Sequence, residues 1–416
     1  MALPMPTQVT PLRTTLAMFA AFAFAYFFSA LVRAVTATLA PVFSAELGLS
    51  AGDLGLLGGA FFLGFSLLQL PLGRALDRWG PRRVLMLFLA LAVLACTAFA
   101  VARSFAGLLA ARALIGVGVS ACLMAPLTAY RLRLGAAAQL RANSWMLMIG
   151  SLGMLASTLP VQWLLPAIGW RGLFWAVAGL LALATALIAF VVPRDGAPSP
   201  ASPGAADAEG GYRAIFGHHY FQRLAPLAFF VYGGLIAVQS LWAGPWLTQV
   251  AGHSAIGAAR DLFLINLSML IAFFGWGAAM PHLASCGWQV NRLIALGTPV
   301  SLLLLGGAVV LGPAAGAAWW AAWCVSCTVV SLSQPAVALA FSPSAAGRAL
   351  SAFNLVIFLG VFCIQWGIGL AIDALVALRW ARGAAFQAAF GLFALACVLS
   401  YIWFLWGGRR PAPQPG

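Results

Sequence analysis

Long apolar runs alternate with short polar breaks along almost the whole chain of 416 residues. A helix of about 20 apolar residues is long enough to cross the hydrocarbon core of a bilayer, and twelve stretches of this sequence meet that condition. We place these twelve predicted spans at residues 14–39, 54–76, 84–102, 106–130, 142–165, 172–192, 223–249, 261–283, 292–312, 315–341, 350–375 and 384–406. The pattern therefore predicts an all-α membrane protein with twelve transmembrane helices.

One break between predicted spans is much longer than the others. Residues 193–221 are rich in Pro, Gly, Ser and Ala and end near the pair His218–His219, a composition typical of a flexible polar linker. The break divides the spans six and six. We therefore predict an N-terminal six-helix bundle at residues 1–192, a cytoplasmic linker at 193–221 and a C-terminal six-helix bundle at 222–416.

Composition excludes a soluble protein and most kinds of enzyme site. The chain is 63% hydrophobic and 7% charged, whereas soluble domains keep about a quarter of their residues charged. A net charge of +14 would suggest a nucleic-acid partner in a soluble domain, but positively charged loops explain it in a membrane protein. The seven cysteines lie almost entirely in apolar runs, which argues against a disulfide framework. We expect surrounding lipids, a monomer, no nucleic-acid partner, no metal and no cofactor.

The arginines predict the orientation in the membrane. If the N-terminus is inside, fifteen arginines fall in cytoplasmic segments and five on the opposite face, while Arg33 and Arg112 fall within spans. Positive residues concentrate in the cytoplasmic loops of membrane proteins. We therefore expect a multi-pass protein of the cytoplasmic (plasma) membrane with both termini and the linker in the cytoplasm.

Two motifs carry a resemblance to a known family. The charged stretch between spans two and three reads Gly73-x-x-x-Asp77-Arg78-x-Gly80-x-Arg82-Arg83, and span four contains Arg112-x-x-x-Gly116-x-Gly118. In residue type, spacing and position, this sequence resembles the major facilitator superfamily of transporters. Pro81 stands where the family pattern has a basic residue, and span five lacks the Gly-Pro signature of drug–proton antiporters. Drug antiport is therefore disfavoured.

The resemblance implies a conformational role for the charged loop. It would dock against the C-terminal half in one conformation and release it in the other, so the candidate gating residues are Gly73, Asp77, Arg78, Gly80, Arg82 and Arg83. We also expect Gly73 to let two helices approach closely, as small residues do inside membranes. The alternative is that the basic side chains only bind anionic lipid headgroups.

Arg33 and Arg112 are the charged residues predicted inside spans. Arg33 lies about 9 Å from the predicted midplane at about 1.5 Å per residue, and Arg112 falls at a similar depth. A charge at this depth costs about 2.5 kcal/mol or more unless it is paired or hydrated. The two would form an electropositive pocket suited to a carboxylate or phosphate. The alternatives are that Arg33 extends to the interface and that Arg112 is a structural hydrogen-bond donor.

Polar residues within spans complete the candidate cavity for a substrate or coupling ion. Tyr26 and Arg33 are seven residues apart and share a helix face, and Asn354 and Gln365 are eleven apart and share another. The predicted lining residues are Tyr26, Arg33, Arg112, Asn143, Asn354 and Gln365. Each amide side chain has the alternative role of a helix–helix hydrogen bond.

These features predict a secondary active transporter, not an enzyme, that moves a small solute by alternating access. The absence of Asp or Glu near the middle of any predicted span favours an organic anion or zwitterion as solute and weakens a carboxylate proton relay. Asp373, at the outer end of span eleven, is the nearest candidate. A proton remains a candidate coupling ion, which would make the protein a symporter, and uptake is favoured slightly over efflux. The alternatives are a non-transporting receptor or a membrane-embedded enzyme on a similar scaffold.

Overall fold

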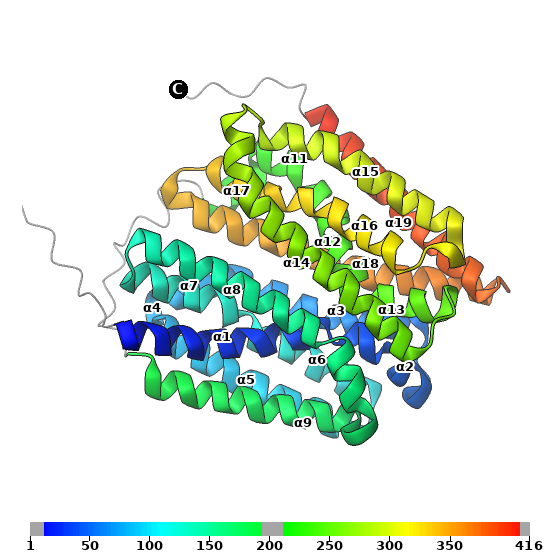
Figure 1. Cartoon of the computed structure of the whole chain (residues 1–416), viewed down its shortest axis with the longest axis horizontal. Helices are drawn as coiled ribbons and strands as arrows, with labels where there is room; N and C mark the ends of the chain where they lie inside the picture. Colours follow the sequence, from blue (N-terminus) through cyan, green and yellow to red (C-terminus); the bar gives the residue numbers. More distant parts are fainter. Residues whose placement is uncertain (1–11, 194–210, 408–416) are drawn as a thin grey trace, which may run out of the picture.

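The computed structural model describes residues 12–193 and 211–407, and every regular element within these ranges is a helix. The helices form two groups (Figure 1), which we call the first half and the second half. The helices of the first half are α1 (Leu12–Ala34), α2 (Thr36–Leu47), α3 (Ala51–Leu67), α4 (Gln69–Trp79), α5 (Pro81–Val101), α6 (Phe105–Val119), α7 (Ala121–Arg133), α8 (Ala136–Ala156) and α9 (Leu159–Val191).

The second half begins after the linker and has the same number of spans. Its helices are α10 (Gly211–Gly217), α11 (His219–Leu227), η1 (Ala228–Tyr232), α12 (Gly233–Ala237), η2 (Val238–Trp242), α13 (Ala243–Pro245), η3 (Trp246–Val250), α14 (Ala255–Ser285), α15 (Val290–Leu311), η4 (Gly312–Ala314), α16 (Ala317–Cys327), η5 (Thr328–Leu332), α17 (Ser333–Leu339), α18 (Pro343–Ala377) and α19 (Arg382–Gly407). Three π-helical turns, η1 to η3, interrupt the seventh span. Such turns occur often at functional sites.

The predicted twelve-helix fold is confirmed, although breaks within helices alter the simplest count. Ten described helices are long and apolar enough to cross a membrane, or eleven if α3 and α4, bent by 45° at Leu68, form one span. The remaining predicted span is α8 continued by the start of α9. Gly169, with φ 64°, separates this part of α9 from the sixth span. A positive φ suits glycine because it has no Cβ.

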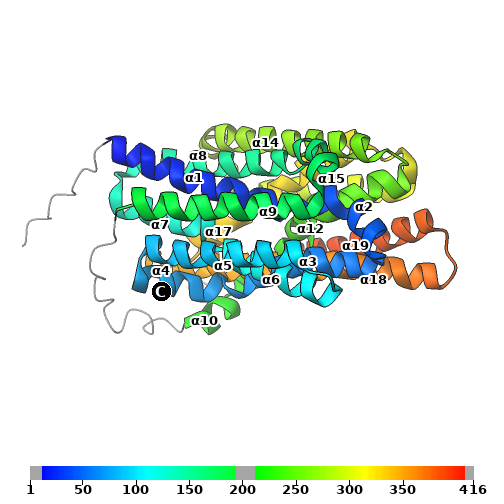
Figure 2. The same cartoon turned by 90° about the horizontal axis from the view of Figure 1, so that it is seen from below.

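The helices run side by side along one direction, so each half has two ends (Figure 2). We call the end where α9 stops and α10 begins, on the left in both figures, the linker side; the other end is the opposite side. Large apolar side chains cover the outer surface between the two ends: Phe190, Val310 and Leu339 are 89%, 83% and 85% exposed. Such a surface fits lipid rather than water.

The predicted linker is only partly within the described residues. Residues 194–210 lie outside them, and the prediction of a flexible polar segment is wrong for 211–221, where α10 and the start of α11 are helical. His218, expected to be solvated, packs its ring 4.6 Å from the ring of Phe341. Burial lowers the pKa of His218, and the charge of His219 lowers it further. Tyr212 also donates a hydrogen bond from its hydroxyl to the Leu70 carbonyl, 3.5 Å away, which connects α10 to the first half.

Candidate functional site

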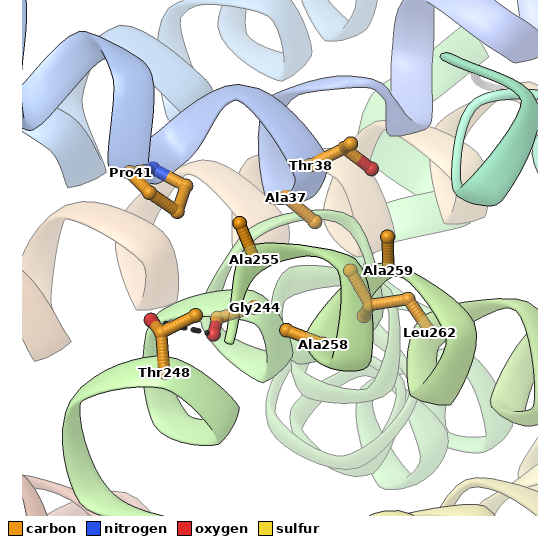
Figure 3. A pocket seen from close by; sticks show the side chains of 9 residues that line it. All are labelled: Ala37, Thr38, Pro41, Gly244, Thr248, Ala255, Ala258, Ala259 and Leu262. Carbon is orange, nitrogen blue, oxygen red and sulfur yellow. Dashed lines mark hydrogen bonds between the residues drawn. The ribbon is translucent and has the colours of Figure 1, made fainter. Parts of the chain in front are cut away.

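The two halves meet tightly on the opposite side of the molecule. A Cβ added to Gly244 would lie 2.3 Å from the carbonyl oxygen of Ala37, so the backbones of α13 and α2 are in direct contact there. Figure 3 shows the hole beside this contact, which has a volume of about 10 Å³ and is lined mainly by small side chains such as Ala37, Thr38, Ala258 and Ala259. A single water needs about this much space. This side of the interface is therefore closed to a solute.

Arg33 lies in the last turn of α1, a helix that contacts η2 of the second half. The charge of Arg33 acts electrostatically on Tyr232, at the end of η1. The Arg33 side chain is half-buried. Among the interactions of the described residues, no hydrogen bond or ion pair involves its guanidinium. A half-buried cation without a hydrogen-bonded partner among the described residues can bind an anion that enters from solution.

Tyr26 is held in place by close packing against α8. A Cβ on Gly150 would lie 2.5 Å from the Tyr26 ring, so only glycine leaves room for this contact. Asn143 lies seven residues before Gly150, which places it on the same face of α8. The buried Oδ1 of Asn143 has no hydrogen-bond partner among the described residues. It is thus a free acceptor on the helix that positions Tyr26.

The depth argument predicted that Arg112 and Arg33 share an open pocket. The structure instead buries Arg112 within the first half. Its side chain is 2% exposed. The guanidinium donates to the Val32 carbonyl at 3.1 Å and to the Thr36 hydroxyl, and its Cζ lies 5.0 Å from the centre of the Phe61 ring. These partners all belong to the first half. Val32 and Thr36 flank the break between α1 and α2, so Arg112 holds the chain together where the helix is interrupted.

Gln365 and Asn354 form helix–helix hydrogen bonds within the second half. The Gln365 amide donates to the Ser240 hydroxyl at 3.0 Å, which connects α18 to η2. The Asn354 Oδ1 accepts from Gln334 at 2.7 Å, which connects α18 to α17. Both residues are buried. Their contacts match the alternative role of such amides in membranes, although the buried Oε1 of Gln365 keeps no partner among the described residues.

The charged loop forms the turn between α4 and α5 on the linker side. Gly80 adopts φ 79°, and Pro81 then occupies the first turn of α5. Proline suits this position because its missing N–H would have no partner in the helix. Pro81, in place of the family's basic residue, thus stabilises the start of α5.

The charged side chains of this loop make contacts within the first half. Asp77 lies 4.0 Å from Arg131 of α7, and both side chains are mostly exposed. Arg82 donates to the Ala189 carbonyl at the end of α9, whereas Arg78 and Arg83 are exposed. The expected close approach at Gly73 is wrong in this conformation, because no atom lies within 4 Å of a Cβ added there.

The described residues hold no metal-binding cluster of three or more His, Cys, Asp or Glu side chains. The seven cysteines are all free thiols, and five of them are buried.

Comparison with known proteins decides the family. The family model described as the Major Facilitator Superfamily matches residues 22–363. The chain belongs to the major facilitator superfamily. It is thus a multi-pass membrane protein of a family that transports solutes, as the two motifs indicated. Among curated protein sequences, none matches this chain.

Solved structures of other superfamily members share the fold. A bacterial homolog of the human lysosomal transporter Spinster, inward-facing and unoccupied, superposes with a TM-score of 0.74 at 18% identity, covering 97% of this chain and 100% of the other. The POT family transporter PepTSo gives 0.75 at 15% identity, with 95% and 98% coverage. A D-xylose–proton symporter gives 0.72 at 17% identity, with 94% and 96% coverage. At these identities the similarity establishes the fold alone.

The structure gives Asp373 a partner that the sequence does not indicate. Its carboxylate reaches the start of α3 in the other half, as described below. The glycines of α3 and α18 are the signal in the sequence for this close approach.

Proposed function

We propose that this superfamily member is a secondary active transporter that moves a small organic anion or zwitterion across the cytoplasmic membrane by alternating access. The observation that carries the proposal is Arg33: a half-buried cation in the last turn of α1, a helix that contacts the other half, without an ion-pair partner among the described residues. An unpaired charge within a span is costly, and a bound anion would offset that cost.

The location of Arg33 between the halves suits alternating access. Arg33 belongs to the first half, and its helix α1 contacts η2 of the second, so an anion held by Arg33 would lie near both halves. Relative motion of the halves would then change the environment of the solute. The closed opposite side corresponds to one end state of such a cycle. With the linker side in the cytoplasm, as the arginine distribution supports, this state would load or release solute on the cytoplasmic side.

In this proposal Arg112 positions the site rather than binding the solute. Its bonds to Val32 and Thr36 support the break directly after Arg33, so it sets the direction of the last turn of α1. The coupling ion is to be tested with a proton first, because one structure with the same fold is that of a proton symporter.

An uptake screen tests this proposal. The purified protein, reconstituted in liposomes, would be offered labelled carboxylates, phosphate esters, short peptides and neutral sugars, each with and without an imposed proton gradient. We expect saturable uptake of at least one anionic or zwitterionic solute, and stimulation by the gradient if a proton is coupled. Uptake of neutral sugars alone, unaffected by competing anions, would contradict the anion assignment.

The charged loop provides a second prediction. Asp77→Asn should slow transport by up to about fivefold, because removing a negative charge that binds a helix N-terminus in one conformation costs up to about 1 kcal/mol. The initial uptake rate and the amount of protein in the membrane would be measured together. Arg74→Ala, which removes an exposed charge of α4 that is not among the candidate gating residues, is the matched control. An unchanged rate for Asp77→Asn would remove the gating role from this residue.

A further inference from the structure

The start of α3 is bound by a carboxylate from the other half. The backbone N–H groups of Ala51 and Gly52 donate to the two oxygens of Asp373, at 3.0 and 2.7 Å. Asp373 lies near the end of α18, 321 positions away from Gly52 in the chain. The first amides of a helix have no partners within it and carry partial positive charge. A carboxylate that accepts from two of them therefore makes strong, charge-assisted hydrogen bonds.

The other amides of this helix start are satisfied within the first half. The Asp53 N–H donates to the Ser50 hydroxyl, and the Asp53 carboxylate accepts from the Ser50 N–H, both at 3.1 Å. The Leu54 N–H donates to the Ser50 carbonyl at 3.0 Å. The helix thus has a complete capping box of its own. Asp373 provides what this local motif leaves unsatisfied, so the contact serves both the helix and the junction between the halves.

A face of glycines allows α3 and α18 to approach closely enough for this contact. Gly52, Gly55 and Gly59 follow one another at spacings of three and four, which places them on one side of α3. A Cβ at Gly55 would lie 2.3 Å from the Gln365 carbonyl oxygen, and one at Gly369 would lie 2.3 Å from the Ala51 carbonyl oxygen. The two backbones are therefore in direct contact across the interface, as the central position of both helices in Figure 1 illustrates.

We propose that Asp373 is a latch that holds the opposite side of the transporter closed, and that its release is required for this side to open. The latch rests on the proposed alternating access. When the halves separate here, the hydrogen bonds from the Ala51 and Gly52 amides to the Asp373 carboxylate must be replaced by hydrogen bonds to water. Water can hydrate all these groups once this side is open. The latch therefore favours the closed state over the open state but still allows the transporter to change between them.

Hydrogen–deuterium exchange of the full chain in lipid nanodiscs tests the latch. The informative segments are 37–43 and 243–250, which meet across the halves at Ala37 and Gly244 and do not include the α3 start. Asp373→Ala should accelerate exchange in both segments by about tenfold or more, because hydrogen bonds to charged groups contribute enough to shift opening by this factor. Gly369→Ala, which inserts a methyl group against the Ala51 carbonyl, should open the same segments with Asp373 intact.

The matched control is Asp53→Ala, which removes the local cap from the same helix start. It should accelerate exchange only near residues 50–54. If Asp373→Ala affects only that region, or nothing, Asp373 is a helix cap and not a latch. If Asp373→Ala does not fold, Asp373→Asn and Gly369→Ala decide the question by the same criterion. No solute is present in this measurement, so failure of the uptake screen and failure of the latch are separate results.

Discussion

Replacing Arg33 with alanine is expected to lower uptake of the anionic solute by about a hundredfold. A guanidinium that binds a carboxylate or phosphate makes charge-assisted hydrogen bonds of about 1.5–3 kcal/mol each, and loss of about 3 kcal/mol corresponds to a factor of about a hundred. Because the described contacts of Arg33 do not include a structural hydrogen bond, the variant should retain its thermal stability. Initial uptake rates and a melting temperature in detergent would be measured on the same preparation.

Two further variants separate binding from general charge effects. Arg33→Lys should restore part of the activity, since lysine keeps the charge but lacks the planar fork that binds two oxygens at once. Arg103→Ala removes an exposed arginine on the opposite side and should leave uptake unchanged. Full transport by Arg33→Ala would show that the solute does not depend on this cation, and equal losses in Arg33→Ala and Arg103→Ala would point to net charge instead.

Replacing Gly116 with alanine is expected to prevent stable folding of the first half. A Cβ at this position would lie 1.9 Å from the Phe61 carbonyl oxygen, and Gly64 of α3 packs in the same way at 2.1 Å from the Ala113 carbonyl oxygen. The obstructing atoms belong to the backbone, so no side-chain rotation can remove the clash. Overpacking of this kind costs about 1–3 kcal/mol and more where the backbone cannot shift. The melting temperature and the monodisperse fraction in detergent would be measured.

Gly73→Ala is the matched control for this prediction. Both glycines are helical and both belong to the family motifs, but Gly73 has open space around its Cβ position. Alanine favours the helix over glycine by about 0.5–1 kcal/mol, so Gly73→Ala should be neutral or slightly stabilising. A similar loss of stability in both variants would mean that the α3–α6 contact is not the reason for glycine at position 116.

The membrane architecture was predictable because it depends on properties that a sequence states directly. Apolar runs of about 20 residues must become helices in a bilayer, since a helix satisfies its own backbone hydrogen bonds. The long polar break predicts a division into two halves. The pattern could not show the interruptions at Val35 and Leu68, because an apolar residue in a bent helix looks the same as one in a straight helix.

The candidate site was predictable only in its chemistry. Depth along a span placed Arg33 and Arg112 at one level, and the bonds of Arg112 to residues 32 and 36 agree with that level. The depth of a residue along a span does not show which way its side chain points around the helix axis, however. The structure encloses Arg112 in the packing of the first half and leaves Arg33 half-buried, so the predicted pair of cations becomes one enclosed arginine and one that is partly accessible.

The sequence by itself determined that this is a membrane protein, how many helices it has and to which superfamily it belongs. Hydrophobicity and local motifs can be seen over short distances along the chain. Only the tertiary structure decided which polar groups meet. Arg33 with Tyr232 and Asp373 with the start of α3 are pairs between residues far apart in sequence. Their meeting depends on how closely the two halves approach, and that distance is set by glycine backbones in contact across the interface.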